Sequence, residues 1–503
     1  MEAYALDTPQ AAFGRSCGRF ETMVSWLDGE ESAGCTHAEL EARLQVDGRE
    51  LLRQLLQDHL DLRAQREPRL TEVVGAEGVA RGSAEAGRER KLATVFGDVA
   101  VRRVAYRERG HADLHPADGA LNLPEETYSH GLRRLAAVEA TRGSFAEAAQ
   151  AVEHASGQRL GNRQVEQLTQ RAACDFDHFY ASRRRHLCQA TDVLVLSCDG
   201  KGIVMRPEAL REPTRKAAGK ASRKLVTRLS RGEKRNRTRM AEVGAVYDAA
   251  PVPRTPDEIL PAPGQQRPHA RSWPVARGKW LVASVVADAA EVITAVFDEA
   301  DRRDPAHRRT WVALVDGNIH QLDRIHAEAR ARGVQVTVVV DLVHVLEYVW
   351  RAAWCFFDEG DPAAETWVRA HGLRILQGRA SDVAGAIRRK ATWAGLAAGR
   401  RNGADTCANY LTSKRPYLDY ATALERGWPI ATGVIEGACR HLVKDRLDRT
   451  GARWGLAGAE AILKLRALRS NGDFDDYWAH HLAQERRRVH EARYADGVIP
   501  AAR

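Results

Sequence analysis

No apolar run in the 503-residue sequence is long enough to cross a membrane. The opening residues, MEAYALDTPQAAFGRSCG, also lack the basic segment followed by an apolar segment that is typical of a secretory signal peptide. We therefore expect a protein that does not enter a membrane and that is located in the cytoplasm.

Cysteine is scarce, and no two cysteines form a C-x-x-C pair. This spacing argues against a disulfide framework and a zinc ribbon, and it fits a reducing compartment. The sequence also lacks an internal repeat and a glycine loop that could cradle phosphates. The missing loop disfavours a phosphatase. The eight cysteines are Cys17, Cys35, Cys174, Cys188, Cys198, Cys355, Cys407 and Cys439.

Basic residues exceed acidic ones, 76 to 67, which gives a net charge of +9 and suits a polyanionic partner. Residues 211–239 concentrate this excess, with twelve Lys or Arg and two Glu. Because the stretch has little apolar content and no helical stripe, we expect a solvated, mobile loop. We also expect it to neutralise DNA phosphates, with Arg235 and Arg237 among the contacts.

The N-terminal part of the sequence has mainly helical patterns. Residues 1–90 are expected to be helical, and 94–109 to form a hairpin around Gly97-Asp98. Ser144 and Glu147 match a capping box, and Gly157 a helix stop. A second helix is expected to begin with Asn162 as its N-cap, as part of a helix-turn-helix or a plain helical hairpin. Arg163 and Gln164 are candidates for reading base edges.

From residue 191 the pattern changes to strands followed by helix–strand alternation, which indicates an α/β sheet. Residues 291–303 are expected to continue as strand and then helix. We expect six regions: a helical region 1–90; a hairpin and helix-turn-helix-like DNA-binding region 91–190; the first part of the α/β core, 191–357; a helical insertion 358–430; a final core helix 431–475; and a C-terminal tail 476–503.

Two apolar strands end in Asp-Gly, at Asp199 and Asp316. Carboxylates at adjacent strand ends share the crevice where ligands bind in open α/β sheets. Converging acids repel one another unless a cation lies between them, and oxygen ligands suit Mg²⁺ or Mn²⁺. Glu436 is the expected third acid, with Arg440 and Lys444 following on the same helical face as a phosphate track.

Several longer motifs resemble the DDE transposases of bacterial insertion sequences, in particular the ISKra-type group. The matching stretches lie between about residues 190 and 480, with further matches in YRERG, LNLPEE, YSHGLRRLAA and GSFAEAA. They are LSCDGKG, VALVDGNIHQL, VVVDLVHVLEYVWRAA, PIATGVIEGACRHLVKDRLDRTGARW and LRALRSNGDFDDYW.

The resemblance implies an RNase H-like catalytic core that uses two divalent metal ions, Mg²⁺ or Mn²⁺, to cleave and join DNA strands at element ends. Carried over by motif, Asp199, Asp316 and Glu436 are the catalytic acids and metal ligands. The implied partner is double-stranded DNA, bound by a homo-oligomer that is associated with the bacterial nucleoid. Recognition of the element ends is expected in the helical part, around 144–180.

Asp341 also ends a strand and is the alternative second acid. It lies in a D-x-x-H motif, in which His344 is expected to organise DNA near the site. Trp454 is expected either to stack on an extruded base or to pack in the core.

Two other functions remain open from the residues alone. One is an RNase H-like DNA nuclease or resolvase that cuts without strand transfer. The other is a transposase-derived DNA-binding protein that has lost catalysis, which the three acids disfavour.

Overall fold

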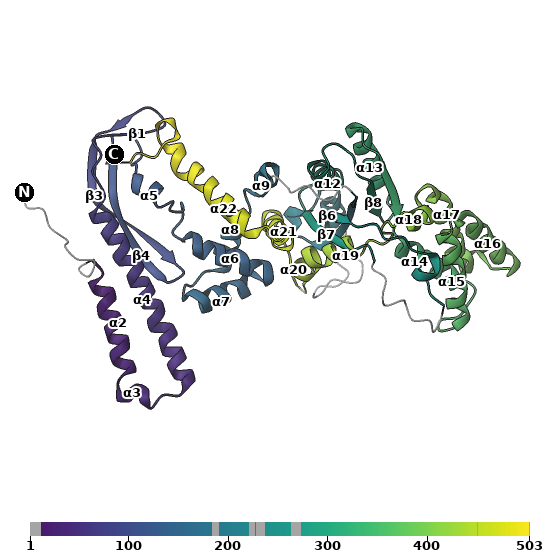
Figure 1. The fold of residues 1–503 in the computed structure, drawn as a ribbon, viewed down its shortest axis with the longest axis horizontal. Coiled ribbons are helices and arrows are strands. Elements are labelled where there is room, and N and C mark those ends of the chain that lie inside the picture. The colour runs from purple at the N-terminus through teal and green to yellow at the C-terminus, as the bar shows by residue number, and fades with distance from the viewer. Residues whose placement is uncertain are drawn as a thin grey trace, which may run out of the picture. The chain divides into compact units, whose positions relative to one another are not determined.

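The computed structural model describes residues 12–183, 191–220, 227, 237–262, 273–449 and 451–501. It is a mixed α/β structure with two compact units, of which unit 1 comprises Met1–Ala181 and Asp473–Arg503 and unit 2 comprises Ser182–Gly472 (Figure 1). The segment 476–503, expected as a tail, is thus part of unit 1. Among the described residues, no helix combines the length and the apolar character that a membrane crossing needs.

Unit 1 begins with a helical hairpin and continues with a β-hairpin. The helical hairpin consists of α2 (Gly14–Leu27), α3 (Glu30–Ala33) and α4 (His37–Gln65), and the short strands β1 (Val73–Val74) and β2 (Ala80–Arg81) follow. The β-hairpin joins β3 (Ser83–Thr94) to β4 (Gly97–Arg107).

The expected boundaries in this region are wrong at two points. Helix ends at Gln65 and does not extend to 90, and the hairpin turn lies at 95–96 and not at Gly97-Asp98. Gly97 takes a φ of 135° as the first residue of β4. The alternating pattern in 97–107 therefore belongs to a single strand, whose partner lies upstream.

The rest of unit 1 is helical. Its elements are α5 (Pro116–Ala120), α6 (His130–Arg142), α7 (Phe145–Ser156), α8 (Asn162–Ala172), α9 (Phe176–Ser182) and α22 (Phe474–Glu485), with η5 (Arg486–His490), η6 (Glu491–Arg493) and η7 (Ala495–Gly497) at the end. The capping box of Ser144 and Glu147 is confirmed, as is the left-handed Gly157 after α7. Helices α6, α7 and α8 pack on one another.

Unit 2 is built on a five-stranded mixed sheet of order β7-β6-β5-β8-β9. Strands β5, β6 and β7 are antiparallel neighbours, and β5, β8 and β9 run parallel. The bounds are β5 (Val193–Val204), β6 (Thr238–Ala249), β7 (Ala276–Ser284), β8 (Trp311–Val315) and β9 (Val336–Val340).

Helix α12 (Ala289–Arg303) packs against β5, β6 and β7. The expected strand at the start of 291–303 is wrong, because Asp288 and Glu291 form a capping box that begins a helix there. Its buried residues recur at helical spacing, as in Val292, Val296 and Ala300.

The main core of unit 2 joins the central strands to α14 and the helices that follow it. As expected, residues 358–430 are mainly helical. The elements of this layer are α14 (Leu342–Ala353), α15 (Pro362–Leu376), α16 (Ala380–Trp393), α17 (Ala398–Ser413), η3 (Arg415–Tyr417) and α18 (Tyr420–Glu425). The remaining elements are η1 (Pro207–Ala209), α10 (Glu212–Lys220), α11 (Pro256–Ile259), α13 (Ile319–Arg332), α19 (Gly433–Ala438), the π-helical turn η4 (Cys439–Lys444), α20 (Asp445–Leu447) and α21 (Leu456–Ser470).

The close packing of α12 against the sheet depends on the absence of a side chain at Gly244. A Cβ atom at this position would lie 2.5 Å from Cγ2 of Val296 and 3.0 Å from Cγ1 of Val282. Gly244→Ala should therefore lower the free energy of unfolding by about 1–3 kcal/mol through overpacking, measured by urea unfolding. Gly202→Ala in β5 is the control, since its new Cβ would meet no atom closer than 3.6 Å. Equal stability of the two variants would contradict this account.

Candidate functional site

Asp199 lies inside strand β5, whereas the sequence pattern placed it at the end of the strand. Strand β5 continues to Val204, and Asp199 pairs with Val243 of β6. Gly200 makes no turn; a Cβ there would lie 2.8 Å from Cε of Met240 and 3.0 Å from a carboxylate oxygen of Glu242. The glycine therefore provides space beneath these side chains.

Asp316 follows the last residue of β8, which is the parallel neighbour of β5. The register pairs Ser197 with Leu314, so continuing it by two residues places Asp199 beside Asp316 on one face of the sheet. Gly317 provides the turn here, with a φ of 90°. The backbone N–H of Asn318 donates to the Asp316 carboxylate at 2.9 Å.

Burial raises the pKa of the Asp199 carboxyl, and the negative charge of Asp316 adds to this rise. Two hydrogen bonds oppose it, from the backbone N–H of Gly200 at 2.7 Å and from the thiol of Cys439 at 3.4 Å. Burial and the Asp199 charge also raise the pKa of the Cys439 thiol, so the thiol keeps its proton and acts as donor. Asp199 is thus a half-buried acid beside a second acid.

Glu436 lies on α19, which packs against β5 and β6. Cys439, the residue bonded to Asp199, is three positions further on, and residues at this spacing are neighbours on a helix surface. Thr432 donates its hydroxyl to the Glu436 carboxylate at 3.1 Å, and Glu436 is exposed. The helix therefore brings Glu436 to the part of β5 that holds Asp199.

Asp341 has a structural environment that differs from that of Asp316. It is 2% exposed and caps α14 by accepting the backbone N–H groups of Val343 and His344 at 3.3 and 3.0 Å. It also accepts the N–H of Thr432 at 3.1 Å. Since β8 lies between β9 and β5, the geometry favours Asp316 over Asp341 as the partner of Asp199.

Tyr410, on the inserted helix α17, is a site residue that the sequence pattern did not indicate. Its hydroxyl donates to the backbone carbonyl of Asp316 at 2.9 Å, and its ring stacks on Tyr348 with centroids 4.0 Å apart. His344 contacts both rings edge-on, at 5.4 Å from Tyr348 and 6.0 Å from Tyr410. Tyr410 therefore links His344, by a ring contact, to the Asp316 turn, by a hydrogen bond.

We expected Glu436, Arg440 and Lys444 to lie on one face of an α-helix. This expectation is wrong, because the chain is not α-helical from Cys439 onward. Residues Cys439–Lys444 wind as a π-helix, a rare turn that often occurs at functional sites. Arg466 of α21 donates to the carbonyls of His441 and Leu442 in this turn. Arg440 and Lys444 are exposed, and Arg440 lies 3.8 Å from Asp445.

The basic stretch 211–239 is described in part. Helix α10 forms its beginning, where the sequence pattern predicted a loop. Arg237 is half-buried, and its backbone carbonyl accepts the N–H of Met205 at 2.9 Å. Arg235 lies outside the described residues.

In unit 1, Arg163 and Gln164 are both exposed on α8. Gln164 accepts the backbone N–H of Gly161 at 2.8 Å, so its side chain closes the start of the helix. The N-cap is Gly161 and not Asn162. In unit 2, Trp454 is 6% exposed and donates to the carbonyl of Leu447, as a core residue does.

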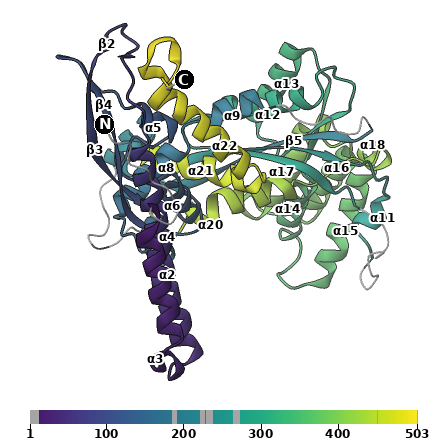
Figure 2. The same cartoon turned by 60° about the vertical axis from the view of Figure 1, so that its left-hand side comes forward.

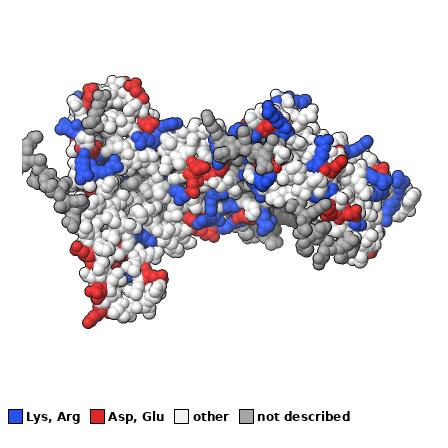
Figure 3. All heavy atoms as spheres, in the orientation of Figure 1, with Lys and Arg blue, Asp and Glu red and all other residues white. Residues whose placement is uncertain are grey.

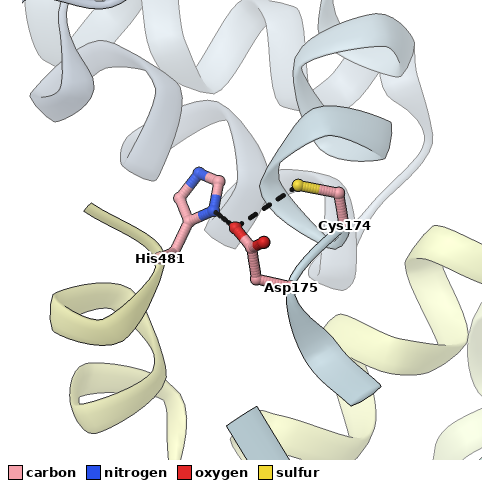
Figure 4. A group of neighbouring side chains, drawn as sticks. All are labelled: Cys174, Asp175 and His481. Carbon is pink, nitrogen blue, oxygen red and sulfur yellow. Dashed lines mark hydrogen bonds and ion pairs between the residues drawn. The ribbon is translucent and has the colours of Figure 1, made fainter. Parts of the chain in front are cut away.

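A second group of polar side chains lies in unit 1. Among the described residues, Cys174, Asp175 and His481 are the set whose possible metal-donor atoms all lie within 4.8 Å of one another, and the three expected acids do not form such a set. Figure 4 shows the Asp175 carboxylate between the other two side chains. It accepts from His481 at 2.6 Å and Cys174 at 3.4 Å.

Arginine, however, already supplies positive charge to this group. Arg488 donates to both Asp175 oxygens, at 2.9 and 3.1 Å, and Arg133, whose side chain is fully buried, donates to His481 at 3.2 Å and to Glu485 at 2.9 Å. A guanidinium at this position disfavours a metal ion. The group is a partly buried ion-pair network that joins α6, the turn between α8 and α9, α22 and η5.

Comparison of the chain with protein-family models and with curated proteins finds no match.

Loss of the Asp341 cap should destabilise the protein. Asp341→Ala leaves three N–H groups without their acceptor, so we expect a loss of about 2–4 kcal/mol in the free energy of unfolding. The control is Asp361→Ala, which removes the exposed cap of α15 and should cost about 1 kcal/mol. Urea unfolding measures both variants, and a smaller effect at Asp341 than at Asp361 would contradict the structural role.

His130 should make unit 1 less stable in mild acid. Burial and the charge of Arg133 lower the pKa of His130 to about 4, while one ring nitrogen lies 2.8 Å from the carbonyl of Asn122 and the other 3.2 Å from Arg133. The folded state thus holds the neutral ring, and the unfolded chain takes up a proton below about pH 6.5.

Stability should therefore fall as the pH drops from about 6.5 to 4, by up to about 3 kcal/mol from this residue. Urea unfolding of the wild type and of His130→Gln across this range measures the effect. The variant should lose less stability than the wild type, and parallel pH profiles would count against the assignment.

Proposed function

We propose that the chain is a DDE-type transposase that binds the ends of an insertion sequence and catalyses DNA strand cleavage and strand transfer. The observation that carries this proposal is the proximity of Asp199 on β5 to Asp316, which directly follows the parallel neighbour β8. Cys439, three residues after Glu436, also bonds to Asp199. Three antiparallel strands followed by two parallel ones, in the order β7-β6-β5-β8-β9, support an RNase H-like core.

The donor chemistry at this position fits Mg²⁺ or Mn²⁺. Asp199 and Asp316 offer carboxylate oxygens. Burial, and to a smaller extent the charge of Asp316, raises the pKa of Asp199, and a divalent cation between the two carboxylates would favour their charged forms. Asp199, Asp316 and Glu436 would hold the ions. When bound, such ions would activate a water molecule or a 3′-hydroxyl as the nucleophile, and they would also stabilise the leaving oxygen of an in-line displacement at phosphorus.

The chain's own residues position the acids and the DNA. Gly200 and Cys439 fix the Asp199 carboxylate by hydrogen bonds, and Tyr410 fixes the backbone of the Asp316 turn. The exposed Arg440 and Lys444, on the turn after Glu436, are suited to contact backbone phosphates.

We further propose that unit 1 recognises element ends, with Arg163 as a contact on double-stranded DNA. Arg163 is the better candidate for reading a base, because the Gln164 side chain caps its own helix. His344, the basic stretch 211–239 and its Arg235 and Arg237 would contact the DNA near the chemistry. The protein would act as a homo-oligomer in the bacterial cytoplasm, on nucleoid DNA.

The test is a cleavage assay with the purified full chain, Mg²⁺ or Mn²⁺, and duplex DNA carrying the sequences that flank the gene. Asp199→Asn, Asp316→Asn and Glu436→Gln should each reduce cleavage by at least about 100-fold, since loss of groups that merely support metal ligands already costs 10–100-fold. DNA binding, measured alongside, should be kept. Glu365→Gln, at an exposed position on α15, is the control.

The products of this assay separate the alternatives. Cleavage followed by joining of the 3′ ends to a second duplex indicates a transposase, and cleavage without joining indicates a nuclease or resolvase. Binding without cleavage by the wild type would show a DNA-binding protein. Cleavage that persists in chelator or in the Asp199→Asn variant would disprove the proposed site.

A further inference from the structure

The helical hairpin α2–α3–α4 leaves apolar side chains exposed. In Figures 1 and 2, α3 lies at the free end of this hairpin, beyond the end of the β3–β4 hairpin within unit 1. Two helices alone cannot enclose a core, so their remaining apolar faces stay in water. Six large apolar residues are between 37% and 57% exposed, namely Phe20, Val24 and Leu27 on α2 and Leu44, Leu52 and Leu55 on α4.

The contacts between the two helices define the orientation of these residues. On α2 the contact line includes Ser16 and Arg19, which bond to Asp58 and Glu50 of α4. At 100° per residue, the exposed apolar stripe of α2 lies about 90° clockwise from that line when viewed from the N-terminus.

On α4 the exposed apolar stripe lies about 120° clockwise from the line of residues that contact α2, when α4 is viewed from its own N-terminus. Because the two helices are antiparallel, equal rotations bring both stripes to the same side of the hairpin. The β-hairpin lies on another side, where Arg53 and Gln57 of α4 bond to the carbonyls of Asp98 and Ala100. The six residues therefore form one face, which we call the hairpin face.

The charge of the hairpin argues against DNA as the occupant of this face. Residues 14–65 contain ten Asp or Glu and six Arg, a net charge of −4 within a chain of +9. On the side drawn in Figure 3, acidic side chains, more than basic ones, lie along this hairpin. A phosphate backbone would be repelled here.

We propose that the hairpin face binds the same face of a second copy of this chain, in antiparallel orientation about a two-fold axis near Leu52. The acidic end of the hairpin, with Glu30, Glu31 and Glu41, excludes a parallel pairing, which would place two such ends together. The product is a four-helix bundle with an isologous interface.

The sequence positions match this axis. Glu41 lies 11 residues before Leu52 and Arg63 lies 11 residues after it (52 − 41 and 63 − 52), so each Glu41 faces Arg63 of the other copy. Both residues are exposed, and Glu41 is otherwise near His37, at 3.6 Å. Phe20 lies near the same level as Leu52, since Arg19 beside it pairs with Glu50.

The exposed area is adequate for a dimer. At about 150–200 Å² for a fully exposed large apolar residue, the six residues leave roughly 400–500 Å² of apolar surface on each copy. A standard interface buries about 800 Å² per partner, of which about 56–65% is apolar. The hairpin face therefore supplies the apolar share of such an interface.

The first test is sedimentation of the purified full chain without DNA, at concentrations around 1–50 μM, a range set by the roughly micromolar affinity of modest interfaces. The wild type should be a dimer, and the double variant Phe20→Glu, Leu52→Glu should be a monomer of unchanged helical content. Val46→Glu is the matched control, because Val46 is 64% exposed on the other side of α4, and it should remain dimeric. A monomeric wild type, or a dimer that survives the double change, would overturn the proposal.

The second test reverses single charges and mixes the products. Glu41→Arg places two arginines at each contact between identical copies, and Arg63→Glu places two glutamates there, so each variant alone should form a weaker dimer. A mixture of the two variants restores opposite charges at both contacts. Mixed dimers, counted by energy transfer between labelled copies, should exceed the one half that random pairing gives. Pairing at the random level would rule out the antiparallel arrangement, and neither test depends on the proposed function.

Discussion

The placement of Asp199, on β5, beside Asp316, which directly follows the parallel strand β8, is the constraint on which the arrangement of unit 2 depends. Burial and like charge both oppose ionisation of Asp199, so the fold must hold this pair in place against its own repulsion. It does so with donors from segments far apart in the chain, since Cys439 bonds to Asp199 and Tyr410 to the Asp316 turn. In the proposed function, a divalent cation between the two carboxylates would offset this repulsion.

The positions of the strands could be predicted from the sequence, whereas their exact ends could not. Apolar runs before Asp199 and Asp316 indicate buried strands, because parallel strands are covered on both faces. The pattern does not reveal that β5 continues through Gly200. The glycine is needed because the side chains of Met240 and Glu242 on the next strand leave no room for a Cβ atom, and not because the chain turns there. At Asp316 the same dipeptide does form a turn. The Asp-Gly dipeptide is the same at the two sites, and it does not show which of them forms a turn.

Unit 1 shows the same division between local and long-range causes. The capping box at Ser144 depends on residues three apart, and the sequence is sufficient to predict it. The network around Arg133 joins α6 to α22, more than three hundred residues later, and no local pattern indicates it. The incorrect assignment of 476–503 as a tail has the same cause, because charged residues of that segment have their partners in the N-terminal part of the chain.

Asp341 illustrates why a motif can identify an important residue without giving its role. Its carboxylate caps α14 and also binds the N–H of Thr432, the residue just before the helix of Glu436. Thr432 in turn donates to Glu436, so one carboxylate fixes the start of the helix that presents another. A buried acid with both oxygens engaged by backbone N–H groups has little capacity left for a metal ion. Asp341 is therefore better placed to position Glu436 than to replace Asp316.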